Sequence, residues 1–322
     1  ANSAVSKVRQ NLQTLYVRRL IKLIDDEASY QMTTAAAYSS LRNIENKGFI
    51  TKDLKCTFPA TVGPQALKPA VEDLCNQAVE AVDQGCNILV LSDRGVNPND
   101  AGIPMLMALG AVHHRLLRAG KRMQCSLVCE TAEARDTHHL ACLIGYGAAA
   151  VNPYLAISVA ADLANHSATS LLSPEEAVTS YMDALEKQLL KVMSKMGIST
   201  VSGYLGAQLF DVVGVDRDVV DMCFEGTVSH LDGVGFDGIA RETLARHQRG
   251  FFAYVMRLVD WGLYRYRRDG DTDSYNPQMV RALHHAVESN DNVQYGVFKG
   301  LVAIQPPVNL RDLIRMNSLA EP

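Results

Sequence analysis

The chain has 322 residues, of which 48% are hydrophobic and 20% are charged, and its formal net charge at pH 7 is −4. This composition is typical of a globular protein, and the charge argues against a dedicated nucleic-acid binder, which normally carries a basic surplus. No apolar run reaches the roughly 20 residues that a membrane-spanning helix needs. A signal-peptide pattern is absent, and seven cysteines do not resemble a secreted disulfide framework. We therefore expect a protein of the cytosol or an organelle matrix, which are reducing compartments, and not a secreted one.

Residues 1–67 are predicted to form a divergent N-terminal segment. Apolar side chains recur at helical spacing over residues 5–25, and the basic side chains fall mostly on the rest of that helix surface, which is typical of a docking helix. Residues 26–66 have weak periodicity and are expected to be largely irregular. The sequence begins with Ala1, so we expect it to be processed, truncated or part of a longer protein.

Residues 68–250 are predicted to form an α/β domain, because short apolar runs alternate with helical patterns. Runs at 87–95, 124–131 and 148–153 have the character of buried parallel strands, and 198–202 is expected to be a fourth. The expected helices span 71–82, 102–120, 133–147 and 174–196, and another is expected to start near Gly206. This alternation predicts a parallel sheet with about four β/α units.

Four units are half of a complete eight-unit barrel. We therefore predict a half-barrel, a reduced TIM-barrel-like fold or an open doubly wound sheet, flanked by extra N-terminal and C-terminal helices. The helix over 174–196 has a complete capping box at its start, with Ser173 as the N-cap and Glu176 three residues later. Residues 251–322 contain a Pro-Pro break and two helical patterns, at 277–289 and 293–303, and are interpreted as a helical arm or linker.

Polar residues gather at the carboxyl ends of the expected strands, which is where parallel α/β folds bind ligands. They are Ser92, Asp93, Arg94, Glu130, Thr131, Asn152, Tyr154, Ser199 and Ser202. The alternative to a ligand site is a closed network that plugs the sheet end, with Arg94 paired to Asp93 or Glu130, and we prefer this alternative. Two further candidates, Lys195 and Gln208, lie near helix ends, and a functional interpretation would use the helix start near Gly206 to bind an anion.

Metal, phosphate and nucleophile motifs give no stronger candidate. The pairs His113-His114 and His138-His139 are adjacent on helices, so their side chains diverge by about 100° and lack the i, i+4 spacing of a ligand pair. Cys125 and Cys129 are expected to be buried, inert thiols. The sequence has no phosphate-binding loop and no nucleophile elbow. We therefore predict no catalytic, cofactor or metal site in this chain.

Several long strings nevertheless resemble one family. These are LVLSDRG, IPMLMALGAVHHRLLRAG, CETAEARDTHHLACLIGYGAAAVNPYLA and LLKVMSKMGISTVSGYLGAQLFDVVGV. Together they resemble the central domain of glutamate synthase, and PPVNLRDLI resembles the connector to its flavin domain. The similarity is expected over roughly residues 68–316, and the wording around Lys121 and Cys129 favours the ferredoxin-dependent, plastid type.

The resemblance implies a parent enzyme that makes two glutamates from glutamine, 2-oxoglutarate and a reductant. In that enzyme an amidotransferase domain releases ammonia, and a tunnel carries it to a domain with FMN and an iron–sulfur cluster. The central domain joins the two and helps to wall the tunnel. The resemblance thus implies partners in the other domains or subunits, no cofactor in this chain, and a plastid stroma or another reducing compartment.

Three functions remain open from the sequence. The chain is the central portion of a glutamate synthase, a relic of that domain recruited as a structural subunit of a larger assembly, or a small enzyme that uses the polar strand-end cluster on a phosphate or carboxylate. In the first two cases the chain alone is not catalytically active. Flavin and iron in the native particle distinguish the first from the second.

Overall fold

The structure is a computed structural model in which residues 48–166, 172–252, 262, 266–268 and 270–314 are described. The chain divides into two compact units, residues 1–253 and 254–322. The helix expected over residues 5–25 lies outside the described residues.

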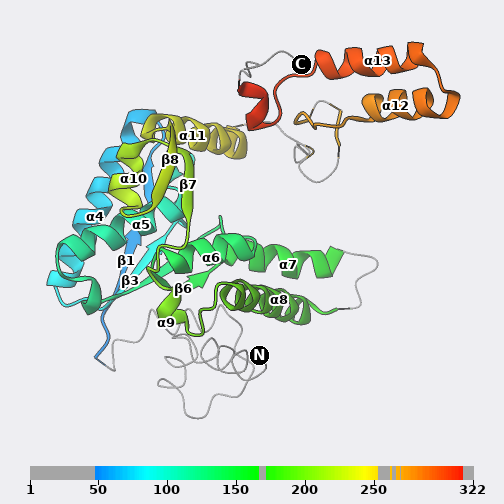
Figure 1. The fold of residues 1–322 in the computed structure, drawn as a ribbon. Helices are drawn as coiled ribbons and strands as arrows, with labels where there is room; N and C mark the ends of the chain where they lie inside the picture. Colours follow the sequence, from blue (N-terminus) through cyan, green and yellow to red (C-terminus); the bar gives the residue numbers. More distant parts are fainter. Residues whose placement is uncertain (1–47, 167–171, 253–261, 263–265, 269, 315–322) are drawn as a thin grey trace. The chain divides into compact units, whose positions relative to one another are not determined.

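The first unit is built around a four-stranded parallel sheet with the order β1-β3-β5-β6 (Figure 1). Its strands are Thr51–Lys55, Ile88–Ser92, Ser126–Glu130 and Ala148–Asn152. Each strand lies beside the next one along the chain, without the reversal of order that defines a doubly wound sheet. This succession is that of a barrel segment, and it confirms the predicted α/β fold with a parallel sheet of four units.

Three helices connect the strands of this sheet, and a fourth follows its last strand. The connecting helices are α4 (Leu67–Asp83), α5 (Met105–Arg118) and α6 (Thr137–Gly145), and α7 (Tyr154–His166) follows β6. Leu89 and Leu91 of β3 belong to the main core with residues of α4 and α5, whereas Val90 packs in a separate small cluster. Because alternate strand residues point to opposite faces, both faces of β3 are covered, and all five of its residues are buried.

Two smaller sheets complete the first unit. Strands β2 (Thr57–Pro59) and β4 (Asp100–Gly102) pair antiparallel, and β7 (Asp211–Val215) and β8 (Val228–Val234) pair parallel. Helix α10 (Arg217–Cys223) connects β7 to β8 and packs on α5, and α11 (Phe236–Phe252) follows. The backbones of α5 and α10 come close together, since a Cβ on Gly110 would lie 2.1 Å from the carbonyl oxygen of Cys223.

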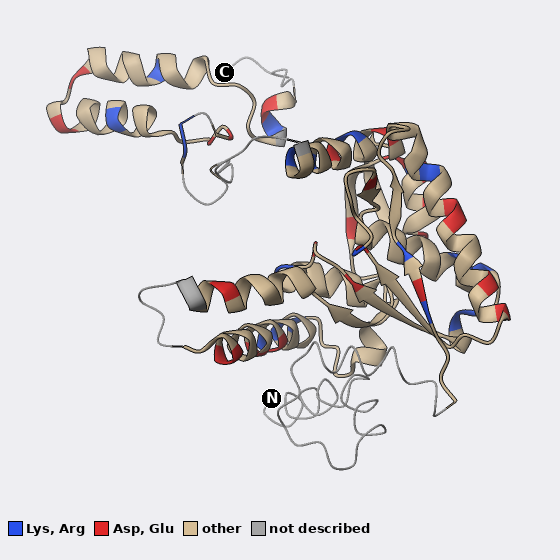
Figure 2. Cartoon of the chain, turned by 180° about the vertical axis from the view of Figure 1, so that it is seen from behind, with Lys and Arg blue, Asp and Glu red and all other residues tan. Residues whose placement is uncertain are grey.

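A long helix, α8 (Pro174–Lys195), packs against α6 and α7. Its predicted capping box is present: the Ser173 hydroxyl accepts from the amide of Glu176, and the Glu176 carboxylate accepts from the amide of Ser173. Acidic residues lie in its first turn and Lys195 lies in its last, which complements the helix dipole; its charged residues can be followed in Figure 2. Leu189 and Met193 of α8 pack with Tyr204 of the short helix α9 (Val201–Tyr204).

The second unit contains two helices at the predicted positions, α12 (Pro277–Ser289) and α13 (Asn292–Ala303), which pack on each other. Asn276 caps the start of α12, and Asn290 ends it in the left-handed conformation at φ 48°. Short 3₁₀ helices in the described residues are η2 (Pro64–Ala66), η3 (Arg122–Gln124) and, in this unit, η4 (Leu310–Leu313).

Two predictions about residues 198–210 are wrong. The expected strand at 198–202 is a loop that leads into α9, because the Thr200 side chain accepts a hydrogen bond from the amide of Gly203 and thereby starts a helix. The helix expected near Gly206 is also absent, since residues 207–210 have no regular structure and lead into β7. The fourth strand of the parallel sheet is instead β1, in a stretch that was expected to be irregular.

None of the helices in the described ranges combines the length and the apolar character that a membrane crossing requires.

A matched pair of glycine substitutions tests the close approach of α5 and α10. Gly110→Ala should lower the free energy of unfolding by about 2 kcal/mol, because the added methyl group meets the backbone at Cys223. Gly250→Ala, in α11 with nothing within 4 Å of the new Cβ, should leave stability unchanged or raise it by up to about 1 kcal/mol. Urea denaturation of both variants measures the difference. Equal effects would contradict the packing described here.

Candidate functional site

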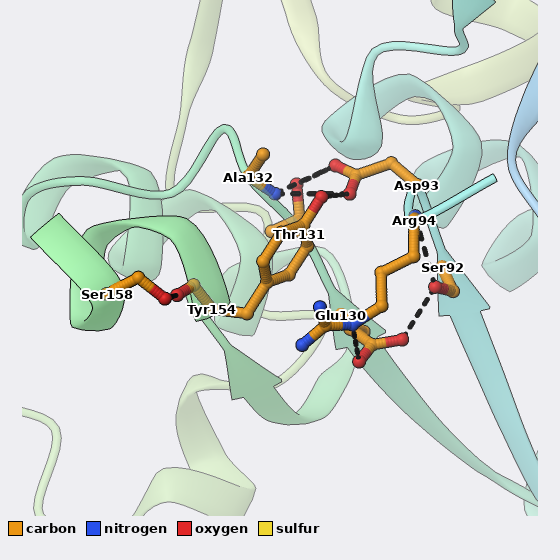
Figure 3. A network of polar contacts seen from close by, with 8 residues as sticks. All are labelled: Ser92, Asp93, Arg94, Glu130, Thr131, Ala132, Tyr154 and Ser158. Carbon is orange, nitrogen blue, oxygen red and sulfur yellow. Dashed lines mark hydrogen bonds and ion pairs between the residues drawn. The ribbon is translucent and has the colours of Figure 1, made fainter. Parts of the chain in front are cut away.

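The polar cluster at the carboxyl end of the sheet is organised around two buried carboxylates (Figure 3). The first is Glu130, the last residue of β5, which is 0% exposed. Ser92 donates to its Oε2 at 2.6 Å, and Nε of Arg94 donates to its Oε1 at 2.5 Å. The sheet register brings these groups together, because Ser92 and Glu130 are paired positions of β3 and β5.

The second carboxylate is Asp93, which follows β3 and is 6% exposed. Its Oδ2 accepts from the hydroxyl of Thr131 at 2.6 Å and from the amide of Ala132 at 2.9 Å, and its Oδ1 accepts from the hydroxyl of Tyr154 at 2.7 Å. Burial, together with the hydrogen bond to Asp93, raises the pKa of Tyr154. The phenol therefore stays protonated and serves as a donor at neutral pH.

Arg94 joins the two halves of the cluster. Its guanidinium carbon lies 3.9 Å from the centroid of the Tyr154 ring, a cation–π contact, while its Nε is bound to Glu130. The Arg94 side chain is 49% exposed, so it covers the buried carboxylates from the solvent side. Both carboxylates thus have hydrogen-bond donors inside the protein, and Glu130 also has a counter-charge, as buried carboxylates require.

This arrangement braces three strands and the start of α7 more readily than it performs chemistry. The oxygens of Asp93 are occupied by three donors, and Glu130 is occupied by two. A general base or a nucleophile needs a group that can reach a substrate, and neither buried carboxylate offers one. The closed-network alternative is therefore the interpretation that the geometry favours.

The other predicted site residues do not join this network through their side chains. Asn152 contributes its backbone carbonyl, which accepts from the amide of Thr131 at 3.0 Å. Lys195 is the last residue of α8 and Ser199 lies beyond that helix, and both are exposed. Gln208 is exposed in the segment whose neighbour Gly206 donates to the carbonyl of Gly145, just before β6 begins. Gln208 therefore lies toward the amino end of the sheet, opposite Asp93.

One functional contact was not foreseen. Glu133 is an exposed residue, but its Oε2 accepts from the amide of Met105 at 2.7 Å, so it caps α5 from another part of the chain. Partial desolvation of this carboxyl group raises the pKa of Glu133. The one signal in the sequence was position: Thr131–Glu133 comes directly after a buried strand, where the chain has to turn back toward the sheet.

The histidine pairs do not form a metal site. His113 accepts at Nδ1 from Nε of Arg122 at 3.0 Å, whereas Nε2 of His138 lies 3.6 Å from the sulfur of Cys142. In the described residues, no three histidine, cysteine or acidic side chains are grouped so that they could hold a metal ion. All seven cysteines lie in the described ranges and none is in a disulfide. Burial raises the pKa of Cys129, so it is a protonated thiol rather than a thiolate ligand.

The comparisons with known proteins decide the family. The family described as glutamate synthase central domain matches residues 5–216. The chain belongs to this family. The match extends into residues 5–67, where we expected little similarity.

Relatives that are named glutamate synthases are much longer than this chain. Ferredoxin-dependent glutamate synthase of Pyropia yezoensis is 34% identical over all of this chain, which covers 22% of that protein. Ferredoxin-dependent glutamate synthase 1, chloroplastic/mitochondrial, of Arabidopsis thaliana is 40% identical over 79% of this chain and 16% of that protein. The chain therefore spans about a fifth of the length of the relatives that it matches.

A solved structure, mandelate oxidase with benzoyl-formic acid, is 20% identical to this chain and has a TM-score of 0.36. It covers 58% of this chain and 49% of its own. A likeness this low supports no inference about function.

Removing Arg94 tests the closed network. Arg94→Ala should lower the free energy of unfolding by about 2 kcal/mol, because it leaves the buried Glu130 without its cation. Arg241→Ala is the matched control, since its pair with Asp237 is exposed on both sides and should be worth under about 0.5 kcal/mol. The double variant Arg94→Ala/Glu130→Gln should recover part of the loss. Equal losses for Arg94 and Arg241 in urea denaturation would refute the bracing role.

The pH dependence of stability tests the burial of His113. Burial, with Arg122 and His114 beside it, lowers the pKa of His113 to about 3. Between pH 6.5 and 3 the unfolded chain binds a proton here that the folded chain does not, so stability falls as pH falls. The loss between pH 6.5 and 5 should be about 2 kcal/mol. Burial also lowers the pKa of His114, which adds a loss of the same sign.

The variant His113→Gln should have a flatter dependence on pH, because a glutamine carbonyl still accepts from Arg122 but does not titrate. His230→Gln is the control, since that ring is exposed on β8. Urea denaturation at pH 7, 6 and 5 gives the slopes, and an unchanged slope for His113→Gln would show that this ring is not responsible.

Proposed function

We propose that this chain serves as the non-catalytic central domain of a glutamate synthase, in which it joins the amidotransferase and flavin domains and helps to wall the path of ammonia between them. The parent reaction converts glutamine, 2-oxoglutarate and a reductant into two glutamates. The observation that carries the proposal is the closed state of the strand-end network. At the edge of the sheet where barrel enzymes hold their reacting groups, Asp93 and Glu130 are buried and fully engaged.

The same edge does not fit the phosphate of FMN. A phosphate-binding edge offers free backbone amides or a helix start, whereas here the amide of Ala132 donates to Asp93. Two buried carboxylates would also repel a phosphate dianion. We therefore assign FMN to a different domain of the parent enzyme.

An iron–sulfur cluster does not fit the described cysteines either. Cluster ligands are thiolates grouped around one centre. Burial raises the pKa of Cys56 and of Cys129, and the described residues contain no group of three such ligands. The cluster, like FMN, belongs to a neighbouring domain in this proposal.

The names of the relatives extend the proposal to the electron donor of the parent enzyme and to its compartment in the cell. Relatives in Pyropia and Arabidopsis are described as ferredoxin-dependent, and the latter as chloroplastic/mitochondrial. We therefore expect reduced ferredoxin as the electron donor of the parent enzyme and a plastid as its compartment.

The native particle that carries this chain tests the proposal. Affinity purification with an antibody against residues of α13 should recover amidotransferase and flavin polypeptide sequence, with about one FMN and one iron–sulfur cluster for each copy of this chain. The recombinant 322-residue chain should form no glutamate from glutamine and 2-oxoglutarate with reduced ferredoxin. A large particle with unrelated subunits and no flavin would show instead that the domain acts as a scaffold. Glutamate formation by the chain alone would refute its non-catalytic role.

A further inference from the structure

A cavity of about 470 Å³ opens at the amino end of the sheet, away from the strand-end network. We call it the amino-edge cavity. Its walls come from α5, the end of α6, the segment before β7 and the turn before β8. The lining residues that matter below are His113, His114, Tyr146, Gln208, Phe210 and Thr227. Its volume lies within the range of small-molecule sites.

The first polar group of the cavity is a buried imidazole in a fixed state. His113 is 9% exposed, and its Nδ1 accepts from Nε of Arg122 at 3.0 Å. Arg122 is itself held by the carbonyls of Cys125 and Gly147, each at 2.8 Å. Because Nδ1 is an acceptor, the neutral ring carries its proton on Nε2.

This Nε2–H has no hydrogen-bond acceptor among the described residues, and the nitrogen itself is not fully buried. It faces the Gly206 side of the cavity, 3.9 Å from the position that a Cβ on Gly206 would take. Nε2 of His114, in the same wall, is buried without a hydrogen-bond partner in the described structure. Buried polar groups are normally satisfied. The unpartnered Nε2 of His114, next to an unpartnered donor on the largely buried His113, therefore indicates that a ligand of the cavity supplies a missing partner.

The second polar group is the side-chain amide of Gln208. This residue has φ 51°, and the other non-glycine residue at positive φ in the described chain, Asn290, is explained as a helix cap. For glutamine the left-handed region is disfavoured, and strained backbone is concentrated at binding sites. The Gln208 amide lies against Gly226, where a Cβ would come within 2.2 Å of its Nε2.

The charged groups at the rim neutralise each other. Nη2 of Arg118 lies 2.8 Å from the carboxylate of Glu225 and donates to the carbonyl of Asp221 at 2.9 Å. An anionic ligand would have to compete with Glu225 for Arg118, and a cationic ligand would have to compete with Arg118 for Glu225. Two aromatic rings form part of the wall: Tyr146 and Phe210 stack at 5.8 Å, and the Tyr146 hydroxyl is hydrogen-bonded to Thr227 at 2.7 Å.

We propose that the amino-edge cavity binds a neutral, planar small molecule that carries a ring amide or a carboxamide, of the size of a nucleobase. His113 Nε2–H donates to its carbonyl oxygen, and the Gln208 amide, which is both donor and acceptor, pairs with its amide group. The aromatic walls favour a flat ring. This is a binding site rather than a catalytic one, and it is independent of the proposed role as a central domain.

Two matched ligands test the charge argument on the full 322-residue chain. Nicotinamide and nicotinate share one ring, but nicotinamide carries a neutral carboxamide where nicotinate carries a carboxylate. Uracil supplies a ring amide. We expect uracil and nicotinamide to bind with a dissociation constant on the order of 1 mM or tighter, and nicotinate at least tenfold more weakly, in saturation-transfer NMR and calorimetry. No binding of either neutral probe, or equal binding of nicotinate and nicotinamide, would overturn the proposal.

Two matched variants test the position of the site. Gln208→Gly should weaken the binding of the neutral probes at least tenfold while the melting temperature stays the same or rises, because glycine adopts this φ without strain. Asn290→Gly, which relieves positive φ in the second unit, should leave binding unchanged. Unchanged binding in Gln208→Gly would place the ligand elsewhere and overturn the assignment. Since the glycine variant keeps its stability, loss of binding in it cannot be ascribed to unfolding.

Discussion

The parallel sheet depends on the burial of two carboxylates at its carboxyl end. Glu130 is the last residue of a strand and has no exposed surface, and Asp93 follows the neighbouring strand with almost none. Such groups are tolerated only if hydrogen bonds and a counter-charge replace water. Ser92, Thr131, the Ala132 amide and Tyr154 supply the bonds, and Arg94 supplies the charge. These donors come from the ends of three strands, since Ser92 ends β3 and Arg94 follows it, Thr131 and Ala132 follow β5, and Tyr154 follows β6. The strands must therefore be in register before the network can close.

The two ends of the sheet thus differ in whether their polar groups have hydrogen-bond partners within the chain. At the carboxyl end, the carboxylates are matched by donors within the chain. At the amino end, Arg122 is matched by Nδ1 of His113 and two carbonyls, but Nε2 of the same ring is left facing a cavity. In barrel proteins the carboxyl end carries the chemistry and the amino end carries stability. The closed carboxyl end is the observation on which the proposed connecting role rests.

Much of the fold follows from local sequence, and what does not follow has a physical reason. Strands β3, β5 and β6 were predicted because strands buried on both faces are continuous apolar runs. Strand β1 was missed because, at the edge of the sheet, only Leu54 of its five residues is buried. Helix α7 was missed because its apolar residues are not confined to one face, so its period is weak. The strand expected at 198–202 was wrong because the Thr200 cap outweighed a β-branched composition.

Part of the candidate site could also be predicted from local sequence. The pairing of Arg94 with Glu130 needs only two neighbouring strand ends and was foreseen as an alternative. The bonds of Asp93 to Tyr154 and Ala132 depend on where two loops turn, which no local pattern specifies. Ser199 was placed at a strand end because a strand was expected at 198–202, whereas the structure has a loop that leads into α9. Gln208 was placed at a helix start near Gly206, where the structure has no regular element.

The outer strands β7 and β8 leave apolar side chains exposed. Parallel strands are normally covered on both faces, yet Val213 of β7 is 69% exposed and Val228 of β8 is 50% exposed in the described structure. Helix α10 contacts both strands of this pair, and these two valines remain largely exposed among the described residues. Exposed apolar surface of this kind marks interaction sites. Under the proposed role as a central domain, we therefore expect this face to pack against another part of the parent enzyme.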